Sequence, residues 1–382
     1  MTVRFEPFRV DIPQATLDDL HERLTRTRFP EQLPDAGWDY GTELGFLRSL
    51  IEYWRDEYDW RATEARLNGF EHFTTEIDGA NIHFIHARSP EADALPIVLT
   101  HGWPGSVVEF LDVIEPLTSP TAHDGEAADA FHVVVPSLPG YAFSGPTKER
   151  GWHPGRVGRA WSALMAGLGY AKYAAQGGDW GSFVSQQVGV ADPEHCIGVH
   201  VNFLPCLPST EDQTDEEKRY VADSTRYFDD DSGYFKEHST KPQTIGYSLE
   251  DSPVGLAAWI VEKFRTWTDP QGDVEDFFTK DQLIDNLMLY WVTGTGHSSV
   301  RMYYELDKGA RSGSVDITSR VTQPFGYTRY PNEIMGTSRR WADALYPNIV
   351  HFVDTPKGGH FAAFEQPELF VADLQAFARH VR

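Results

Sequence analysis

The stretch GGDWGS, residues 177–182, follows a predicted strand at 173–176 and precedes a predicted helix. Small residues stand two positions before and two positions after Asp179. This spacing lets the chain make the sharp strand-to-helix turn called a nucleophile elbow, which exposes its central side chain at the end of a sheet. An ordinary glycine-rich turn with a capping aspartate is the alternative. We predict that Asp179 is a nucleophile.

The residue type at this position restricts the chemistry. A serine that attacked an sp3 carbon would become an ether, which water does not readily cleave, whereas an aspartate becomes an ester. A second step can hydrolyse that ester. An aspartate at the elbow therefore favours alkyl transfer from an epoxide or an alkyl halide, and it disfavours the acyl transfer of serine esterases.

Short runs rich in β-branched residues alternate with helical stretches around the elbow. Such runs, buried on both faces, predict a mostly parallel sheet flanked by helices, which is an α/β fold. A hairpin with a tight turn at Asp78-Gly79 precedes them, because this pair tolerates the positive φ values of such a turn. The predicted strands are residues 73–77, 81–86, 97–100, 131–135, 173–176, 197–201 and 349–353.

Two further blocks flank the predicted sheet. Residues 1–72 are expected to form an N-terminal helical arm packed on the core, with a first helix capped by Thr16 and a second around 44–54. Residues 206–320 are expected to form a helical insertion, notably at 254–267 and 282–292. We expect it to cover the carboxyl end of the strands as a lid. Residues 73–205 and 321–382 then form the two parts of the core.

Hydrolysis of an ester on Asp179 requires a general base. The chain has 15 histidines, of which His360 stands in a glycine-rich loop directly after the last predicted strand. This gives the chain order nucleophile, acid, histidine. Glu333, in a preceding loop, is our first candidate for the acid that orients the imidazole. Asp343, in a predicted helix, and Asp354, at a strand end, are its rivals.

The stretch HGWPGS, residues 101–106, follows the predicted strand at 97–100. In enzymes with such an elbow, the loop after this strand supplies one backbone N–H of an oxyanion hole, and the residue after the nucleophile supplies the other. We therefore predict Trp103 and Trp180 as backbone donors. Pro104 is a candidate for a cis peptide bond, and His101 is expected to have a structural role.

The composition excludes several classes of partner. Asp and Glu outnumber Lys and Arg by 57 to 33, giving a net charge of −24, which argues against binding to nucleic acid. No stretch has the length and apolar character of a signal peptide or a membrane span. We expect a cytoplasmic protein that does not bind a membrane. The two cysteines have no metal-ligand spacing, and we expect no cofactor and no metal.

Motifs along nearly the whole chain resemble the microsomal-type epoxide hydrolases, with the N-terminal arm of that family but without a membrane anchor, as in its soluble bacterial and fungal members. The resemblance implies the α/β-hydrolase fold, an epoxide and water as reactants, a vicinal diol as product, and the roles given above to Asp179, His360 and Glu333. It also implies two tyrosines that donate to the epoxide oxygen. The best matches for these are Tyr234 and Tyr303, with Tyr304 still open. The motifs are HGWPGS, PSLPGYAFSGP at 136–146, GGDWGS, the stretch from Thr240, and GGHFAAFEQPELF at 358–370.

Two other functions fit parts of the pattern. A haloalkane dehalogenase also combines an aspartate nucleophile with a histidine and an acid, and it has an Asp-Trp pair. A non-catalytic ligand-binding protein can reuse the same fold. For an epoxide hydrolase, the aromatic content favours a bulky apolar substrate. An enediyne-type epoxide is one candidate, with a role in antibiotic biosynthesis or in detoxification. Soluble members are often dimers, so a homodimer is also expected.

Overall fold

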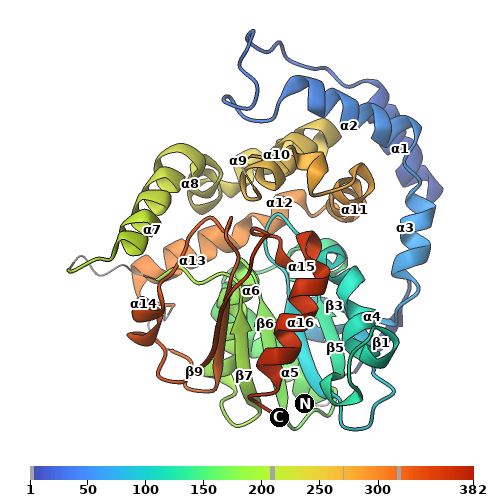
Figure 1. The fold of residues 1–382 in the computed structure, drawn as a ribbon. Coiled ribbons are helices and arrows are strands. Elements are labelled where there is room, and N and C mark those ends of the chain that lie inside the picture. The colour runs from blue at the N-terminus through green and yellow to red at the C-terminus, as the bar shows by residue number, and fades with distance from the viewer. Residues whose placement is uncertain (1–3, 207–210, 270, 316–319) are drawn as a thin grey trace.

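The computed structural model describes residues 4–206, 211–269, 271–315 and 320–382. Nine strands of these residues form one sheet in the order β1-β2-β3-β5-β4-β6-β7-β8-β9 (Figure 1). The pairs β1-β2, β2-β3 and β3-β5 are antiparallel, and all later pairs are parallel. The strands are β1 (Glu6–Phe8), β2 (His72–Ile77), β3 (Ala80–Ala87), β4 (Leu95–Thr100), β5 (Phe131–Pro136), β6 (Tyr173–Gly177), β7 (Cys196–Val201), β8 (Phe325–Arg329) and β9 (Ile349–Asp354).

The seven predicted strands all form. Asp78 and Gly79 have φ values of 52° and 78°, as the tight turn between β2 and β3 requires. Neither β1 nor β8 was predicted from the sequence. A three-residue strand has too few positions to show alternation, and β8, FGYTR, mixes glycine and a charged residue into its short run.

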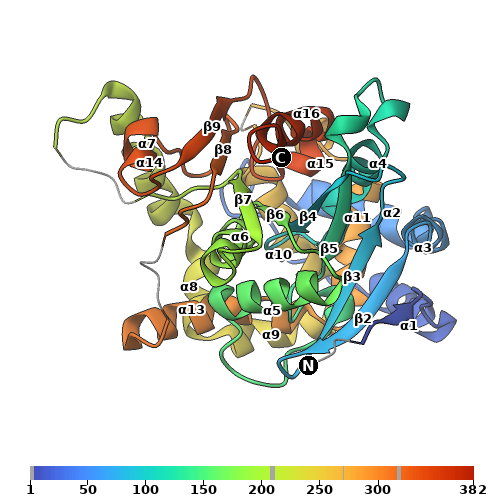
Figure 2. The same cartoon turned by 90° about the horizontal axis from the view of Figure 1, so that it is seen from below.

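Helices cover both faces of the sheet, as an α/β fold requires (Figure 2). One face carries α5 (Pro154–Gly167) and α6 (Trp180–Ala191), and the other carries α4 (Leu111–Thr118) and α16 (Pro367–Ala378). The strands β4 to β7 are buried on both sides as a result. The remaining helices after the insertion are α14 (Arg339–Asp343) and α15 (Ala362–Glu365).

The helical insertion separates β7 from β8 and lies above the carboxyl ends of the parallel strands (Figure 1). Helices form at both places where the sequence predicted them, as α10 and α11. The helices of the insertion are α7 (Asp215–Arg226), α8 (Gly233–Thr240), α9 (Pro242–Asp251), α10 (Pro253–Thr266), α11 (Lys280–Trp291), α12 (Gly296–Ser299) and α13 (Arg301–Ser312).

The N-terminal arm contributes β1 to the sheet and then forms α1 (Gln14–Thr25), α2 (Leu44–Asp56) and α3 (Trp60–Leu67). The prediction of Thr16 as the cap of the first helix was wrong. The helix begins at Gln14, directly after Pro13, and Thr16 already donates its N–H to the Pro13 carbonyl at 2.9 Å. A proline fixes the backbone at the helix entrance without any side-chain cap.

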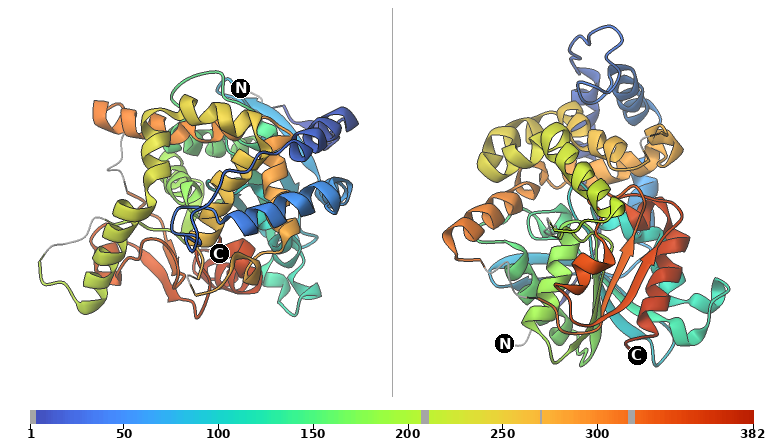
Figure 3. Two further views of the ribbon diagram at one scale, coloured as in Figure 1. Left: turned by 90° about the horizontal axis from the view of Figure 1, so that it is seen from above. Right: turned by 60° about the vertical axis from the view of Figure 1, so that its left-hand side comes forward.

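Much of the arm packs on the insertion as well as on the sheet. Seen from above, α2 runs across α10 and α11 (Figure 3). The Trp54 indole N–H donates to the Met288 sulfur at 3.3 Å, and the Thr42 hydroxyl donates to the Ala258 carbonyl at 2.6 Å. Contacts between the arm and the insertion therefore hold α10 and α11 above the sheet.

A buried polar cluster ties the last helix to the sheet. Asp373 on α16 lies 2.7 Å from His351 Nε2 on β9 and 3.1 Å from His200 Nε2 on β7, and it accepts the Thr328 hydroxyl of β8 at 2.6 Å. Hydrogen bonds to a buried carboxylate contribute more than neutral ones. Three neighbouring strands are thus joined to one helix by a single side chain.

We predict that Asp373→Ala lowers the free energy of unfolding by about 2 kcal/mol or more, because both imidazoles and the Thr328 hydroxyl lose a buried acceptor. Urea denaturation followed by circular dichroism measures this change. The matched control is Asp343→Ala, which removes an exposed pair with Arg339 on α14 and is expected to cost less than about 0.5 kcal/mol. Equal midpoints for the two variants would contradict the role of the cluster.

Candidate active site

The predicted elbow forms at Asp179, between β6 and α6. Asp179 has φ 47° and ψ −125°, a conformation that is strained for a residue with a side chain. Its glycine neighbours are required by close contacts. A Cβ on Gly181 would lie 1.8 Å from the Thr100 carbonyl oxygen, and a Cβ on Gly177 would lie 2.2 Å from the carbonyl carbon of Gly181. The backbone of the elbow is therefore pressed against β4.

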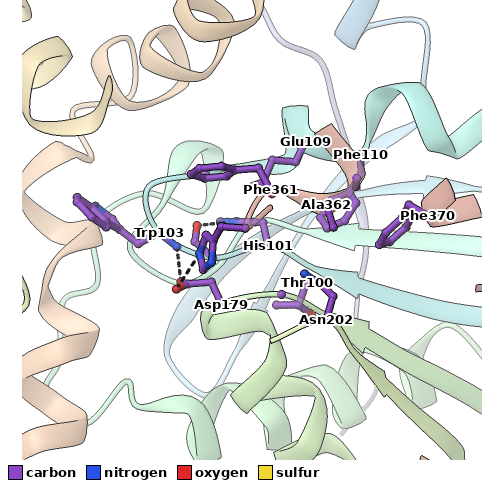
Figure 4. Close-up of a pocket in the computed structure, with 15 residues that line it drawn as sticks. Thr100, His101, Trp103, Glu109, Phe110, Asp179, Asn202, Phe361, Ala362 and Phe370 are labelled. Carbon is purple, nitrogen blue, oxygen red and sulfur yellow. Dashed lines mark hydrogen bonds and ion pairs between the residues drawn. The ribbon is translucent and has the colours of Figure 1, made fainter. Parts of the chain in front are cut away.

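Two groups hold the Asp179 carboxylate. The Trp103 backbone N–H donates to Oδ1 at 2.8 Å (Figure 4), and His360 Nε2 lies 3.4 Å from Oδ2. Trp103 thus sits where an oxyanion-hole donor was predicted, and its peptide bond to Pro104 is cis as expected. Trp180 begins α6 beside Asp179, and its indole N–H is buried without a hydrogen-bond partner in the part of the chain that the structure describes.

His360 and Glu333 form a buried pair. Nδ1 of His360 lies 2.6 Å from a carboxylate oxygen of Glu333, and their side chains are 2% and 1% exposed. The loops after β8 and β9 bring them together, because the Asn332 N–H donates to the Gly358 carbonyl at 3.1 Å.

The rivals for the acid lie elsewhere. Asp343 pairs with Arg339 on the surface of α14, and Asp354 pairs with Arg329 at the end of β9. Of the three candidate carboxylates, Glu333 is the one that touches His360.

The charge state of His360 follows from its two carboxylate neighbours. Burial by itself lowers the pKa of His360, but the charge of Glu333, the hydrogen bond to Asp179 and the remaining interactions with both carboxylates outweigh it. The pKa is raised well above 6.5. At neutral pH the site therefore holds an imidazolium between two carboxylates.

The two predicted tyrosines of the insertion contact the indole of Trp103. Tyr234 stacks on it with ring centroids 5.0 Å apart, and Tyr303 meets it edge-on at 6.0 Å and meets Trp180 at 4.6 Å. Burial raises the pKa of both phenols well above 10, so both stay protonated. Tyr304 faces another way, since its ring lies under Lys308 and lines a groove with His153.

The hydroxyl groups of these tyrosines differ in their partners. The Tyr303 hydroxyl is buried and has no hydrogen-bond partner among the described residues, so it is free to donate to a bound molecule. The Tyr234 hydroxyl lies 2.6 Å from the hydroxyl of Tyr227. Sequence analysis did not single out Tyr227, because nothing in its spacing distinguishes it from the other tyrosines of the chain.

Residues of this group line two cavities. A small one of about 20 Å³ is lined by Asp179 and the buried carboxyl of Glu109 (Figure 4), and by His360. Burial raises the pKa of Glu109 to about 8. Sequence analysis also missed Glu109. A larger cavity of about 890 Å³ is lined by Tyr227, Tyr234 and Glu333, together with residues of the arm and of α7 and α10. Trp103, stacked on Tyr234, lines the small cavity.

Metal-ligand side chains gather elsewhere. Within the described ranges, the one group of three is His200, His351 and Asp373, which lines neither of these cavities. A metal on His200 Nε2 would leave a proton on Nδ1, where it has no hydrogen-bond partner, whereas metal-bound imidazoles normally donate from the other nitrogen. The cluster fits the structural hydrogen-bond role described above better than a metal site.

Comparisons with known proteins agree with this geometry. Residues 5–110 match the family model "Epoxide hydrolase N terminus", and residues 96–242 match the model "alpha/beta hydrolase fold". The chain is 46% identical to a putative epoxide hydrolase of Stigmatella aurantiaca, over 98% of this chain and 85% of that one. It is 37% identical to epoxide hydrolase 1 of Sus scrofa, over 97% and 88% of the two chains.

Solved structures give the same result. The juvenile hormone epoxide hydrolase of Bombyx mori superposes with a TM-score of 0.93 at 32% identity, covering 100% of this chain and 95% of that one. The epoxide hydrolase of Aspergillus niger gives a TM-score of 0.87 at 35% identity, covering 100% and 97%. With its elbow, its buried His360 and Glu333 and its nearly full-length match to these relatives, the chain belongs to the microsomal-type epoxide hydrolase family and is an epoxide hydrolase with the α/β-hydrolase fold.

Proposed function

We propose that the enzyme hydrolyses its epoxide in two steps, through a covalent ester on Asp179. The observation that carries this proposal is the position of the Asp179 carboxylate, which lies between the Trp103 N–H and the His360 imidazole. The Trp103 backbone N–H donates to Oδ1, so Oδ2 is the oxygen that attacks the epoxide. Family membership favours epoxide hydrolysis over the dehalogenase and the non-catalytic binding protein that the sequence left open.

In the first step, Oδ2 attacks an epoxide carbon from the side opposite the C–O bond that breaks. A new bond joins Oδ2 to carbon, and the released oxygen becomes an alkoxide. Tyr234 and Tyr303 donate to this oxygen, and one of them transfers its proton. A neutral phenol suits this role because an alkoxide is a far stronger base than a phenolate.

In the second step, water attacks the Cγ carbon of the Asp179 ester. His360 accepts a proton from the water, and Glu333 stabilises the imidazolium that forms. Oδ1, which accepts the Trp103 backbone N–H, carries the negative charge of the tetrahedral intermediate. The backbone N–H of Trp180 is the second donor. The Cγ–Oδ2 bond then breaks, and His360 returns the proton to Oδ2. The diol leaves with Oδ2, while Asp179 keeps the oxygen of the water.

The first step itself prepares the base for the second. In the resting enzyme, the charges of Glu333 and Asp179 both raise the pKa of His360. Formation of the ester removes the charge of Asp179. The pKa of His360 then falls, so that the imidazole loses its proton and becomes the base that the second step needs.

The large cavity suggests the substrate class. Its volume of about 890 Å³ suits a bulky molecule, and its walls include the rings of Trp38, Trp259, Tyr227 and Tyr234. Carboxylates such as Asp223 and Asp230 also line it, which disfavours anionic substrates. We propose a bulky, uncharged, aromatic epoxide. An enediyne-type natural product fits this class, as does a detoxification substrate.

We also propose residues 1–72 as an arm, residues 73–205 and 321–382 as the core, and residues 206–320 as a lid over this site. We propose that the insertion opens to admit substrate. Among the described residues no helix is both long and apolar enough to cross a membrane. The homodimer and the cytoplasmic location stay predictions.

The two-step scheme predicts that His360→Gln forms the ester but does not release it. Exposure of this variant to styrene oxide should add the mass of the substrate to the peptide that contains Asp179, as measured by mass spectrometry, while the wild type releases diol. Single turnover of the wild type in 18O-labelled water should place the label in Asp179. Label found directly in the diol, with none in Asp179, would exclude the ester.

The change in the pKa of His360 predicts how each step depends on pH. As the pH falls through the pKa of His360 in the ester form, the imidazole is protonated again, so ester hydrolysis should slow while alkylation, which needs no base, continues. Quenched-flow mass spectrometry should therefore find a larger fraction of alkylated enzyme at about pH 5.5 than at about pH 8. Glu368→Gln, a change on the first turn of α16, should leave this profile unchanged. An alkylated fraction that rises with pH would rule out His360 as the base.

A further inference from the structure

Tyr227 and Tyr234 form a hydrogen-bonded pair whose function goes beyond the two proton donors named above. Their hydroxyl oxygens are 2.6 Å apart, and the two residues are 7% and 6% exposed. Among the described residues, this is the hydrogen bond that the structure gives to each of the two hydroxyls. A hydroxyl has one proton, so only one member of the pair donates within it.

An unusual backbone turn makes this contact. Residues seven apart in one α-helix would be about 10 Å apart along its axis. Here a π-helical turn, Tyr227–Asp231, ends α7, and α8 begins after it at Gly233. The change of direction brings Tyr227 back onto Tyr234. Such π-turns occur often at functional sites, where they aim a side chain that a regular helix would direct elsewhere.

The direction of the hydrogen bond decides what Tyr234 can do. If Tyr234 donates to Tyr227, its proton is not available to a substrate. If Tyr227 donates, the proton of Tyr234 is free for the epoxide oxygen, and the donated bond makes Tyr234 a better donor. The same bond then stabilises the phenolate that remains after proton transfer. The second direction is the one that a bound epoxide favours.

A fixed positive charge lies next to the same ring. The ammonium of Lys263, which is 3% exposed, lies 4.8 Å from the ring centroid of Tyr234. Asp231, of the π-helical turn, and Glu262 hold it at 2.7 Å and 3.0 Å. These carboxylates offset part of its charge, but the ammonium is the group that faces the ring. It adds to the stabilisation of a phenolate at Tyr234.

Tyr303 has no such hydroxyl partner, since its own hydroxyl makes no hydrogen bond within the described residues. We infer that the two active-site tyrosines are not equivalent: Tyr234 transfers the proton to the alkoxide, Tyr303 only hydrogen-bonds to it, and Tyr227 is the positioning residue that orients and reprotonates Tyr234. The inference rests on the proposed function. The proton of Tyr234 goes to the alkoxide, the proton of Tyr227 goes to Tyr234, and water in the large cavity, which Tyr227 lines, restores Tyr227.

The test compares single-turnover rates of alkylation and of ester hydrolysis for Tyr227→Phe, alone and combined with Tyr234→Phe or Tyr303→Phe. Alone, it should slow alkylation about tenfold, the worth of one hydrogen bond to a charged group, and leave ester hydrolysis within twofold. Added to Tyr234→Phe, the Tyr227→Phe change should not slow alkylation further. Added to Tyr303→Phe, it should again slow alkylation about tenfold. Tyr247→Phe, at an exposed tyrosine of α9, is the matched control and should match the wild type.

Two outcomes would overturn the inference. Alkylation at the wild-type rate in Tyr227→Phe would show that the pair has no role. If Tyr227→Phe slowed alkylation as much in the Tyr234→Phe variant as it does alone, its role would be merely structural. Tyr227→His, which keeps a donor at this position, should recover part of the rate and provides the measurement if Tyr227→Phe does not fold. Absence of any adduct on Asp179 in His360→Gln would instead refute the proposed two-step function, so the two failures are distinct.

Discussion

The backbone strain at Asp179 is the constraint on which the rest of the structure depends. A side chain at φ 47° persists only where its surroundings enforce it, and here Gly177 and Gly181 let the turn press against β4 with no room for a Cβ. As a result, the backbone sets the position of the Asp179 carboxylate. Its partner is a backbone group, the Trp103 N–H, which lies in the loop directly after β4.

Charge is concentrated around this carboxylate. His360 and Glu333 come from separate loops, yet their side chains are almost completely buried and lie 2.6 Å apart. A buried ion pair is stable only where each charge has a close partner, and His360 has two. The two carboxylates raise the pKa of His360 well above its usual value, so the imidazole is protonated in the resting site.

The helical insertion completes the site from above. It contributes Tyr234 and Tyr303, whose rings pack on Trp103, so the loop after β4 and the proposed proton donors form one aromatic cluster. The arm crosses this insertion and fixes α10 and α11. An irregular turn then sets the environment of Tyr234, through Tyr227 and through the Asp231 that holds Lys263.

The sequence alone determined the elements whose geometry is local. The elbow follows from glycines at fixed spacing around Asp179, the hairpin from Asp78 and Gly79, and the parallel sheet from buried β-branched runs. The order of residues along the chain pointed to His360. Tertiary structure decided what depends on residues far apart in the chain. It separated Glu333 from Asp343 and Asp354, turned Tyr303 rather than Tyr304 toward Trp103, placed Tyr227 on Tyr234, and gave β1 and β8 their places in the sheet. Spacing encodes backbone conformation over a few residues, but which of several similar side chains meet is set only when packing brings separate segments together.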